Sequence, residues 1–380
     1  MTDDATLRRR LDAVQTRLRG PDDSDGEADA LVLFPGRNVQ YLTDWDERPG
    51  ERHLLLFVPA DGDPLALVPA LYETELRTRT PIERLRVWTD DEEPSDHVAA
   101  VCGRLDLDGG RILVDDAMDA RFTQDLRAAM PASTFGLASE VLGPMRLTKD
   151  DVEIAAMRRS AAAADAVVRE LREFGDDAVG MTEAELADWI ADRLSAHGGT
   201  GVSFEVIVGS GPNGAMPHHT HGDREIRAGE PVVLDFGTRV EGYPSDQTRT
   251  LVFGAEAGDE LPAEFRAVHR TVREAQDAAV EAVEPGVACE AVDAAARSVI
   301  EDAGYGDAFV HRTGHGVGLA VHERPSLVEG NERELEPGTV FSVEPGVYLP
   351  EEYGVRVEDL VVVTETGCVR LNRTDRGWRC

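Results

Sequence analysis

The chain has 380 residues, enough for two domains, and its 42 % hydrophobic and 29 % charged residues are typical of a globular protein. Acidic residues outnumber basic ones 73 to 39, and the net charge of −34 argues against nucleic acid or an anionic membrane surface as a partner. The acidic residues are spread along the chain and Lys149 is the only lysine, a composition that indicates adaptation to high intracellular salt.

The compartment is inferred from what the sequence lacks. No segment resembles a signal peptide or a membrane span, so we expect a cytoplasmic protein. The four cysteines lack the spacing of a zinc site or redox motif and are expected to be reduced thiols: Cys102, Cys289, Cys368 and Cys380.

The first 145 residues alternate strand-like and helix-like segments, which predicts an α/β domain. Helices are expected at 5–18 and 120–129, strands at 30–34 and 111–114, a hairpin from 53–59 and 65–69, and a turn with an aromatic patch at 35–45. This part holds only two well-separated histidines and no glycine-rich phosphate loop. We therefore expect it to serve association and to cover the neighbouring site.

A second domain, 146–380, is expected to begin with helices. Thr148 and Asp151 resemble a capping box for a helix at 150–174, and Thr182 and Glu185 resemble another for a helix at 184–196. A strand is expected at 203–209, a loop at 210–223, and further helices at 262–283 and 289–303.

Between these helices, residues 232–253 predict a hairpin, with strands at 232–237 and 248–253 and a turn at 239–242. Asp235 and Asp246 lie about equally far from the turn, so the hairpin would bring them nearly opposite each other. Two half-buried carboxylates repel unless a cation lies between them. A metal ion is the obvious candidate.

A second hairpin near the end of the chain resembles the first. Glu344 ends one apolar strand and Glu358 lies on the return strand. The order helix, helix, hairpin therefore occurs twice, as a weak internal repeat of roughly 110 residues. Two such halves facing each other would place four carboxylates at one centre.

Six of the ten histidines fall in two clusters, 218–221 and 311–322. A single histidine is more often structural than functional, but His315 stands between two glycines and adds an imidazole to the four carboxylates. This donor set suits two divalent ions such as Mn²⁺, Co²⁺ or Zn²⁺ bridged by carboxylates. Such a pair generates a bridging hydroxide and polarises a carbonyl, which implies hydrolysis of an amide.

Five motifs then occur in order: LDFG at 234–237, GYPSDQTRT at 242–250, HRTGHGVGLAVHE at 311–323, SVEPGVY at 342–348 and GVRVED at 354–359. Together they resemble the pita-bread-fold metallopeptidases, in the branch of the Xaa-Pro aminopeptidases and Xaa-Pro dipeptidases (prolidases). NVQYLTDW at 38–45 is similar to the creatinase-type N-terminal domain of that branch. The resemblance implies a mixed α/β (α+β) fold, with a creatinase-like domain at 1–145, a pseudo-twofold pita-bread catalytic domain at 146–380, and a homodimer.

The resemblance also implies roles, residue by residue. The expected metal ligands are Asp235, Asp246, His315, Glu344 and Glu358, with Asp246 and Glu358 bridging two ions, Asp235 on one, and His315 with Glu344 on the other. Glu344 would also relay a proton, His322 would bind the scissile carbonyl, and His218 would assist proton transfer in the pocket. His311 would line the substrate pocket. Strand parity points Arg356 into the same site, where we assign it to supporting the ligands and binding substrate.

Some residues stay ambiguous at this level. His219, His221 and Tyr243 are as consistent with structural roles as with functional ones. Several prolidases carry an arginine shortly after the His-Glu pair that suits a dipeptide's free carboxylate, but here HERPS places Arg324 and Ser326 there, and Arg333 is an unplaced candidate.

The expected reaction is hydrolysis of the bond between an N-terminal residue and proline. Two alternatives on the same fold were weighed: a metal-free creatinase-like amidinohydrolase and a non-catalytic pita-bread binding module. Both usually have substituted ligands, and here none is substituted. The sequence leaves open the metal, the first residue of the substrate, and the choice between dipeptides and longer peptides.

Overall fold

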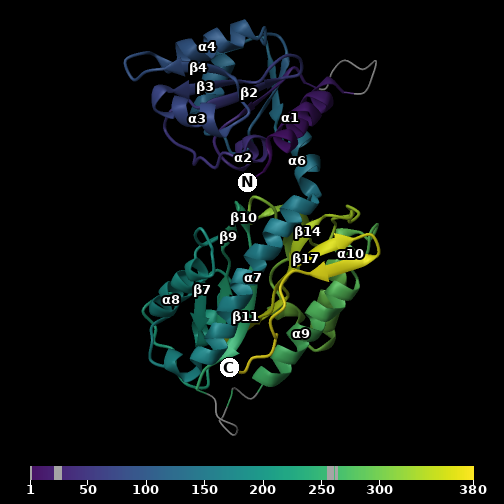
Figure 1. The fold of residues 1–380 in the computed structure, drawn as a ribbon. Helices are drawn as coiled ribbons and strands as arrows, with labels where there is room; N and C mark the ends of the chain where they lie inside the picture. The colour runs from purple at the N-terminus through teal and green to yellow at the C-terminus, as the bar shows by residue number, and fades with distance from the viewer. Residues whose placement is uncertain (1, 21–27, 255–260, 262–263) are drawn as a thin grey trace. The chain divides into compact units, whose positions relative to one another are not determined.

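A computed structural model describes residues 2–20, 28–254, 261 and 264–380, and the chain divides into two compact units, Met1–Arg146 and Leu147–Cys380 (Figure 1). The order of α-helices and β-strands confirms the mixed α/β class. No helix in the described ranges is long and apolar enough to cross a membrane.

The first unit is built on a six-stranded mixed sheet in the order β4-β3-β2-β1-β5-β6. Strand β2 pairs antiparallel with both β1 and β3, and the other neighbours are parallel. The strands are β1 (Ala30–Leu33), β2 (Leu55–Pro59), β3 (Leu65–Pro69), β4 (Arg84–Trp88), β5 (Arg111–Val114) and β6 (Thr134–Leu137). The helices are α1 (Asp4–Arg19), α2 (Arg37–Thr43), α3 (Glu73–Arg79), α4 (Pro94–Arg104), α5 (Ala120–Ala129) and α6 (Ser139–Leu147).

One expectation for this unit is wrong, because residues 37–43 form the helix α2 where a turn was expected. A left-handed Asp44 ends the helix. The Arg10 guanidinium stacks on the Tyr41 ring, and the Tyr41 hydroxyl donates to the Met145 carbonyl oxygen. These contacts join residues distant in sequence, so local propensity did not reveal the helix.

The second unit contains the other four α-helices of the described chain: α7 (Asp151–Phe174), α8 (Glu183–Ala196), α9 (Phe265–Glu281) and α10 (Cys289–Asp302). Its larger sheets run in the orders β11-β8-β7 and β13-β12-β14-β17-β18, and two short ribbons pair β9 with β10 and β15 with β16. The strands are β7 (Ile207–Ser210), β8 (Pro231–Phe236), β9 (Arg239–Val240), β10 (Tyr243–Pro244), β11 (Gln247–Val252), β12 (Gly314–Gly316), β13 (Glu323–Leu327), β14 (Val340–Val343), β15 (Gly346–Leu349), β16 (Tyr353–Arg356), β17 (Asp359–Thr364) and β18 (Gly367–Arg370).

Side-chain caps set the starts of α7 and α8. Thr182 and Glu185 form the expected capping box of α8. The cap of α7 was assigned wrongly, because Asp150 and Glu153 form it, whereas Thr148 makes a β-bridge to Thr339. The strand expected at 203–209 is shorter and begins at Ile207. The expected start of the third helix, at 262–263, lies outside the described residues.

The internal repeat is visible in the strand order, since β8–β11 and β14–β17 each form a long antiparallel pair that continues into a short ribbon. Helices α7 and α8 contact the first sheet, and α9 packs on α10 and contacts the second (Figure 1). Alternate strand residues point into these helix-facing cores, among them Leu234 and Phe236 in the first half and Phe341 and Val343 in the second. The intervening residues must therefore point to the opposite face of each sheet.

Candidate active site and metal centre

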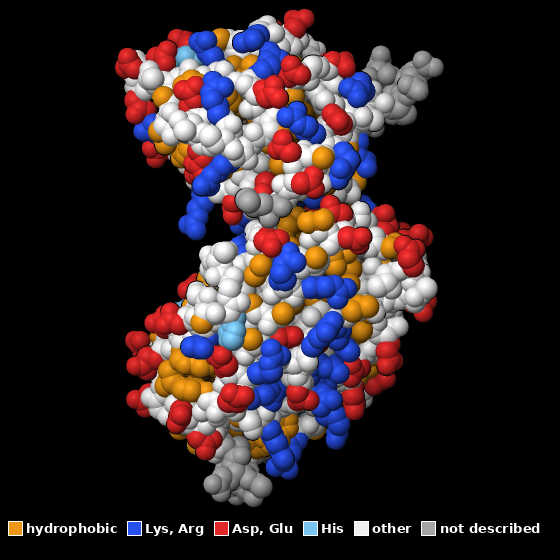
Figure 2. Space-filling view, viewed as in Figure 1, with side chains coloured by type: hydrophobic (Ala, Val, Ile, Leu, Met, Phe, Trp, Pro, Cys, Tyr) orange, Lys and Arg blue, Asp and Glu red, His pale blue; other side chains and the backbone are white. Residues whose placement is uncertain are grey.

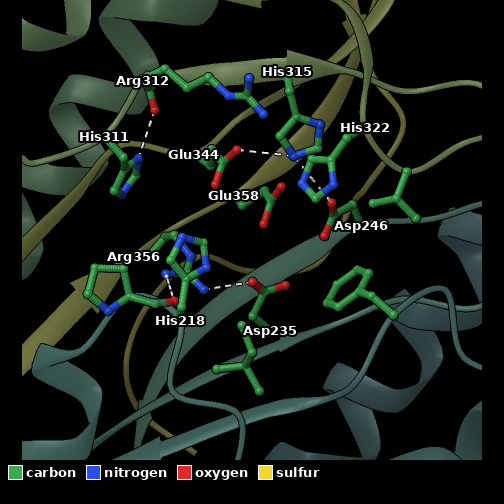
Figure 3. A pocket seen from close by; sticks show the side chains of 14 residues that line it. His218, Asp235, Asp246, His311, Arg312, His315, His322, Glu344, Arg356 and Glu358 are labelled. Carbon is green, nitrogen blue, oxygen red and sulfur yellow. Dashed lines mark hydrogen bonds and ion pairs between the residues drawn. The ribbon is translucent and has the colours of Figure 1, made fainter. Parts of the chain in front are cut away.

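The intervening residues of both halves meet at a cavity of about 480 Å³ (Figure 3). Every site residue expected from the sequence lines it: His218, Asp235, Asp246, His311, His315, His322, Glu344, Arg356 and Glu358. The lining is completed by one unexpected cation, Arg312, and by the apolar side chains Phe204, Ile207, Pro217 and Val321.

The two hairpins present their carboxylates in different registers. In the first, Asp235 pairs with Thr248, so Asp246 lies diagonally across from it, one same-face position away. The aspartates are therefore not opposite each other as expected: the strand register differs from the expected one by two residues. The reason is that the turn is centred on Glu241 and Gly242, both with positive φ. In the second hairpin Val343 pairs with Asp359, and the same register continued into the β15–β16 ribbon places Glu344 opposite Glu358.

His315 is supplied by the short strand β12, where glycines allow close packing. A Cβ at Gly314 would collide with the Ser342 carbonyl, and one at Gly316 with the Arg324 carbonyl. The His315 backbone N–H donates to Ser342 Oγ at 3.0 Å, and that hydroxyl donates to Glu344 Oε1 at 3.0 Å. One serine thus fixes a histidine and a carboxylate together.

The donor atoms fit a metal ion. Atoms of Asp246, His315 and Glu358 lie within 4.8 Å of one another, and all three residues are buried. Three buried carboxylate oxygens accept no hydrogen bond from any described residue: Asp235 Oδ1, Asp246 Oδ1 and Glu358 Oε1. Buried acceptors without partners are costly, and a cation among them removes the cost.

The orientation of His315 supports the same fit. Its Nδ1 lies 3.2 Å from the Gly316 carbonyl oxygen, which can only accept, so Nδ1 carries the proton. Burial lowers the pKa of His315 to about 4, so the ring is neutral near pH 7. The lone pair of Nε2 then faces Glu344 Oε1 at 3.2 Å and Asp246 Oδ2 at 3.7 Å. A nitrogen lone pair that faces two carboxylates is repelled by them unless a cation lies between. The carbonyl contact to Nδ1 is typical of a metal-binding histidine.

The carboxylates also raise one another's pKa. Burial, together with neighbouring carboxylates, raises the pKa values of Asp246 and Glu358 well above the ordinary range, and burial raises that of Glu344. Like charges in one buried cavity disfavour simultaneous ionisation. A bound divalent cation would let all of them ionise.

A hydrogen-bonded chain holds Asp235 from behind. His311 Nδ1 donates to the Arg312 carbonyl oxygen at 2.8 Å, so in the neutral ring Nε2 accepts from the Tyr348 hydroxyl at 2.9 Å. Tyr348 accepts from Arg356 Nη1 at 2.8 Å, and Arg356 Nη2 donates to Asp235 Oδ2 at 2.6 Å. Asp235 keeps one oxygen partnered and turns the other toward the cavity (Figure 3).

Two histidines stand at the exposed mouth of the cavity, His218 and His322. The His322 ring lies against that of His315, with the ring centroids 4.2 Å apart. Burial lowers the pKa of His322, with neighbouring positive charge adding to the effect. Because both side chains are already exposed at the mouth, they can contact a molecule that enters the cavity without moving out of the protein core.

The ambiguous residues contact the scaffold and do not line the cavity. His219 Nε2 lies 2.8 Å from buried Glu183, His221 Nδ1 lies 2.8 Å from the Val206 carbonyl oxygen, and the Tyr243 hydroxyl donates to Glu153 at 2.8 Å. These contacts give the three residues structural roles.

Arg312 is the cavity residue that sequence reasoning missed. It lies two residues before strand β12, and its Nη1 donates to Ser326 Oγ at 3.1 Å. No ion pair recorded between described side chains includes it, so its charge is available to a ligand. No sequence pattern identified it, because its contact with Ser326 arises only in the fold; Arg324 and Arg333 are absent from the lining.

The comparisons agree with this geometry. Residues 155–365 match the model of metallopeptidase family M24, and residues 10–148 match the creatinase/prolidase N-terminal domain. The chain belongs to metallopeptidase family M24. It is a peptidase with the pita-bread fold of the Xaa-Pro peptidases, and membership of this family implies divalent metal ions.

Relatives are similar over nearly their whole length. A probable dipeptidase PepE of Mycobacterium bovis is 42 % identical over 353 residues, covering 92 % of this chain and 91 % of the relative. An Xaa-Pro dipeptidase of Lactobacillus helveticus is 35 % identical over 371 residues, covering 96 % and 97 %. Among solved structures, a prolidase from Thermococcus sibiricus has a TM-score of 0.91 at 36 % identity, covering 100 % of this chain and 99 % of that one. These relatives favour a peptidase over a metal-free amidinohydrolase or a binding module.

Proposed function

We propose that this M24 peptidase is an Xaa-Pro dipeptidase with a dinuclear metal centre. The observation that carries the proposal is the cavity in which four carboxylates and a neutral histidine converge, with three buried oxygens left without partners. Asp246 and Glu358 would bridge two ions, Asp235 would complete one, and His315 with Glu344 the other. Mn²⁺ or Co²⁺ suits this oxygen-rich set best, with Zn²⁺ also compatible.

When bound, the two ions supply an activated water and a Lewis acid for the scissile carbonyl. The chain supplies the proton transfers. Glu344 has a raised pKa and accepts a hydrogen bond from the Ser342 hydroxyl, so it can take a proton and release it to the leaving imino nitrogen. His322 would donate a hydrogen bond to the oxyanion, and His218 would assist the proton transfer.

Substrate recognition is assigned to the rest of the cavity. Phe204, Ile207 and Val321 provide an apolar wall for the N-terminal side chain and the proline ring. Arg312 provides the positive charge that a dipeptide's free carboxylate requires, and a planar guanidinium suits a carboxylate. Relatives named dipeptidase agree with this preference.

Metal and activity can be tested on one preparation. We expect purified protein in high salt to bind two Mn²⁺ or Co²⁺ per chain and to hydrolyse Xaa-Pro dipeptides faster than C-terminally extended peptides. Asp235→Asn should reduce turnover by at least about 100-fold while the circular dichroism spectrum stays unchanged. Absence of metal, and of activity after metal addition, would refute the proposal.

The role of Arg312 has its own test. Arg312→Met should raise KM for an Xaa-Pro dipeptide by about 10- to 100-fold, because a charge-assisted pair is lost, and should leave the Xaa-Pro amide nearly unaffected. Arg333→Met, an arginine away from the cavity, is the matched control. Equal effects on the acid and the amide would assign Arg312 to structure instead.

We also propose that the protein is a cytoplasmic homodimer, on the ground of the family resemblance. Sedimentation velocity in high salt should give a mass near twice the 41.3 kDa of one chain. A single-chain mass across the micromolar range would contradict the dimer.

A further inference from the structure

Behind the cavity lies a fully buried arginine that the proposed mechanism does not use. Arg249 is on β11, three residues after Asp246, and is 1 % exposed. Thr248, beside it, turns its hydroxyl toward Glu358, so the Arg249 side chain points to the opposite face of the strand. It pairs there with Asp359 at 2.7 Å, and both side chains are almost completely buried.

Every N–H donor of this guanidinium has an acceptor. Nε donates to the Asp375 carbonyl at 3.1 Å. Nη1 donates to the carbonyls of Thr248 at 2.9 Å and Glu358 at 2.6 Å. Nη2 donates to Asp359 Oδ1 at 2.7 Å and Thr374 Oγ1 at 2.9 Å. Arginine has five N–H donors in a fixed plane, and all five are used here.

Two of these acceptors belong to the strands that carry metal ligands. The Glu358 carbonyl is the backbone of a ligand itself, and the Thr248 carbonyl lies two residues after Asp246. The Thr248 hydroxyl donates to Glu358 Oε2 at 2.6 Å, and the Glu358 N–H donates back to the Thr248 carbonyl at 3.1 Å. One rigid guanidinium therefore sets the distance between the segments that present Asp246 and Glu358.

Two of the other three acceptors come from residues 374–375, beyond residue 365, where the match to the family model ends. In Figure 1 the last residues (yellow) run beside β11. Gln247 Nε2 also donates to Thr374 Oγ1 at 2.9 Å. Arg172 fastens the same segment, donating to the carbonyls of Asp375 at 3.0 Å and Gly377 at 2.7 Å. No recorded contact joins Arg172 to Thr248, Glu358 or Asp359, so it holds the segment without reaching the ligand strands.

We propose that Arg249 is a positioning residue for the metal centre, held in place by Thr374 and Asp375, and that it fixes the spacing of Asp246 and Glu358. The inference rests on the metal centre of the proposed function but does not depend on the peptide that is cleaved. Lysine cannot replace this arginine, because an ammonium has three donors and no plane with which to join the two strands.

The test compares Mn²⁺ binding, by titration calorimetry without peptide, in Arg249→Lys and Arg172→Lys. Both variants keep the charge and both loosen the 374–377 segment. We expect Arg249→Lys to weaken the second Mn²⁺ equivalent by about 10- to 100-fold, as loss of support behind a ligand does, and Arg172→Lys to bind within about twofold of wild type. Circular dichroism and the unfolding midpoint establish that each variant is folded.

Thr374 gives a milder second variant in case Arg249→Lys does not fold. Thr374→Val should weaken the second Mn²⁺ equivalent by about threefold or more, and Thr374→Ser, which restores the hydroxyl, should recover it. The positioning role would be overturned if folded Arg249→Lys bound Mn²⁺ with wild-type affinity, or if both arginine variants lost equal affinity. If Arg249→Lys is unfolded, wild-type Mn²⁺ affinity in Thr374→Val would overturn it. Wild-type protein that binds no metal would instead refute the metal centre, and protein that binds two ions without cleaving Xaa-Pro would refute only the substrate.

Discussion

The chain from His311 through Tyr348 and Arg356 to Asp235 shows how single residues set the site. Within the chain each member bonds to the next, and the direction of donation follows from the Arg312 carbonyl, which can only accept. The Tyr348 hydroxyl is the centre of this chain, and burial raises its pKa to about 12, so it stays protonated and can donate. Asp235 is thereby oriented by Tyr348 and Arg356, which lie more than 100 positions away in sequence.

Removing that hydroxyl should loosen the chain at both ends. We expect Tyr348→Phe to lower kcat/KM by about tenfold or more, since a hydrogen bond to a charged group contributes about 1.5–3 kcal/mol. Tyr353→Phe is the matched control, because the buried Tyr353 hydroxyl has no hydrogen-bond partner among the described residues. Equal rates for the two variants would show that the chain does not matter for activity.

His269 on α9 predicts how stability depends on pH. It is 2 % exposed and packs beside Phe265, and burial lowers its pKa from 6.5 to about 4. Between pH 6.5 and 4 the unfolded chain binds a proton at this residue that the folded chain does not, so the free energy of unfolding falls as the pH falls. The expected contribution reaches about 3 kcal/mol at the acid end. Denaturant unfolding at pH 7.5 and 4.5 should show a smaller pH effect in His269→Leu than in wild type; an unchanged effect would contradict the assignment.

At the scale of elements, the loop between β7 and β8 carries His218 to the cavity and is held by one buried carboxylate. Glu183, in the first turn of α8, accepts from Ser210 N–H at 2.8 Å, Ser210 Oγ at 2.6 Å and Asn213 Nδ2 at 3.0 Å, and its other oxygen lies 2.8 Å from His219 Nε2. Burial alone would raise the pKa of Glu183, but the bonds from Ser210, His219 and Asn213 outweigh it and lower the pKa. A single ionised side chain thus anchors the first part of the loop, from Ser210 to His219.

Glu183→Gln should therefore weaken the hydrogen bonds that hold the loop and leave the metal centre intact. An amide presents an N–H₂ group where the carboxylate accepts, so at least one donor of the loop loses its partner. We expect kcat/KM to fall by about tenfold, with Mn²⁺ affinity within about twofold of wild type. Glu185→Gln on the same helix is the exposed control and should change neither. A loss of metal binding in Glu183→Gln would show that the anchor extends to the whole site.

The whole molecule carries an unusual distribution of charge. Figure 2 shows acidic side chains over this face of both units. The only lysine, Lys149, has a side chain that is 1 % exposed and lies 3.9 Å from Glu323, so the basic side chains at the surface are arginines. A net charge of −34 favours the unfolded chain through self-repulsion, and salt screens that repulsion.

Salt should therefore stabilise the protein. We expect the thermal midpoint to rise by about 10 °C or more between 0.1 M and 2 M KCl, most steeply at the low end, where the Debye length falls fastest. Choline chloride at equal ionic strength separates screening from specific cation binding. A midpoint independent of salt would contradict the high-salt interpretation of the composition.

The sequence by itself predicted the carboxylates and the histidine that meet at the cavity. Apolar strands that each end in a carboxylate, repeated twice, and a histidine between glycines identified Asp235, Asp246, His315, Glu344 and Glu358, because donor chemistry and strand parity are local properties of the chain. The α8 capping box and the hairpin of β2 and β3 were predictable for the same reason.

Only the tertiary structure decided how these and other residues are positioned. The turn at Glu241 and Gly242 moved Asp246 to a diagonal position, the packing of Tyr41 made α2 a helix, and the approach of Ser326 turned Arg312 into a cavity residue. Arg249 looked like any strand arginine until the fold brought Glu358, Asp359 and Thr374 to its five donors. Sequence encodes the chemistry of each side chain, but contacts between residues 100 or more positions apart depend on how the two halves pack, which no local pattern specifies.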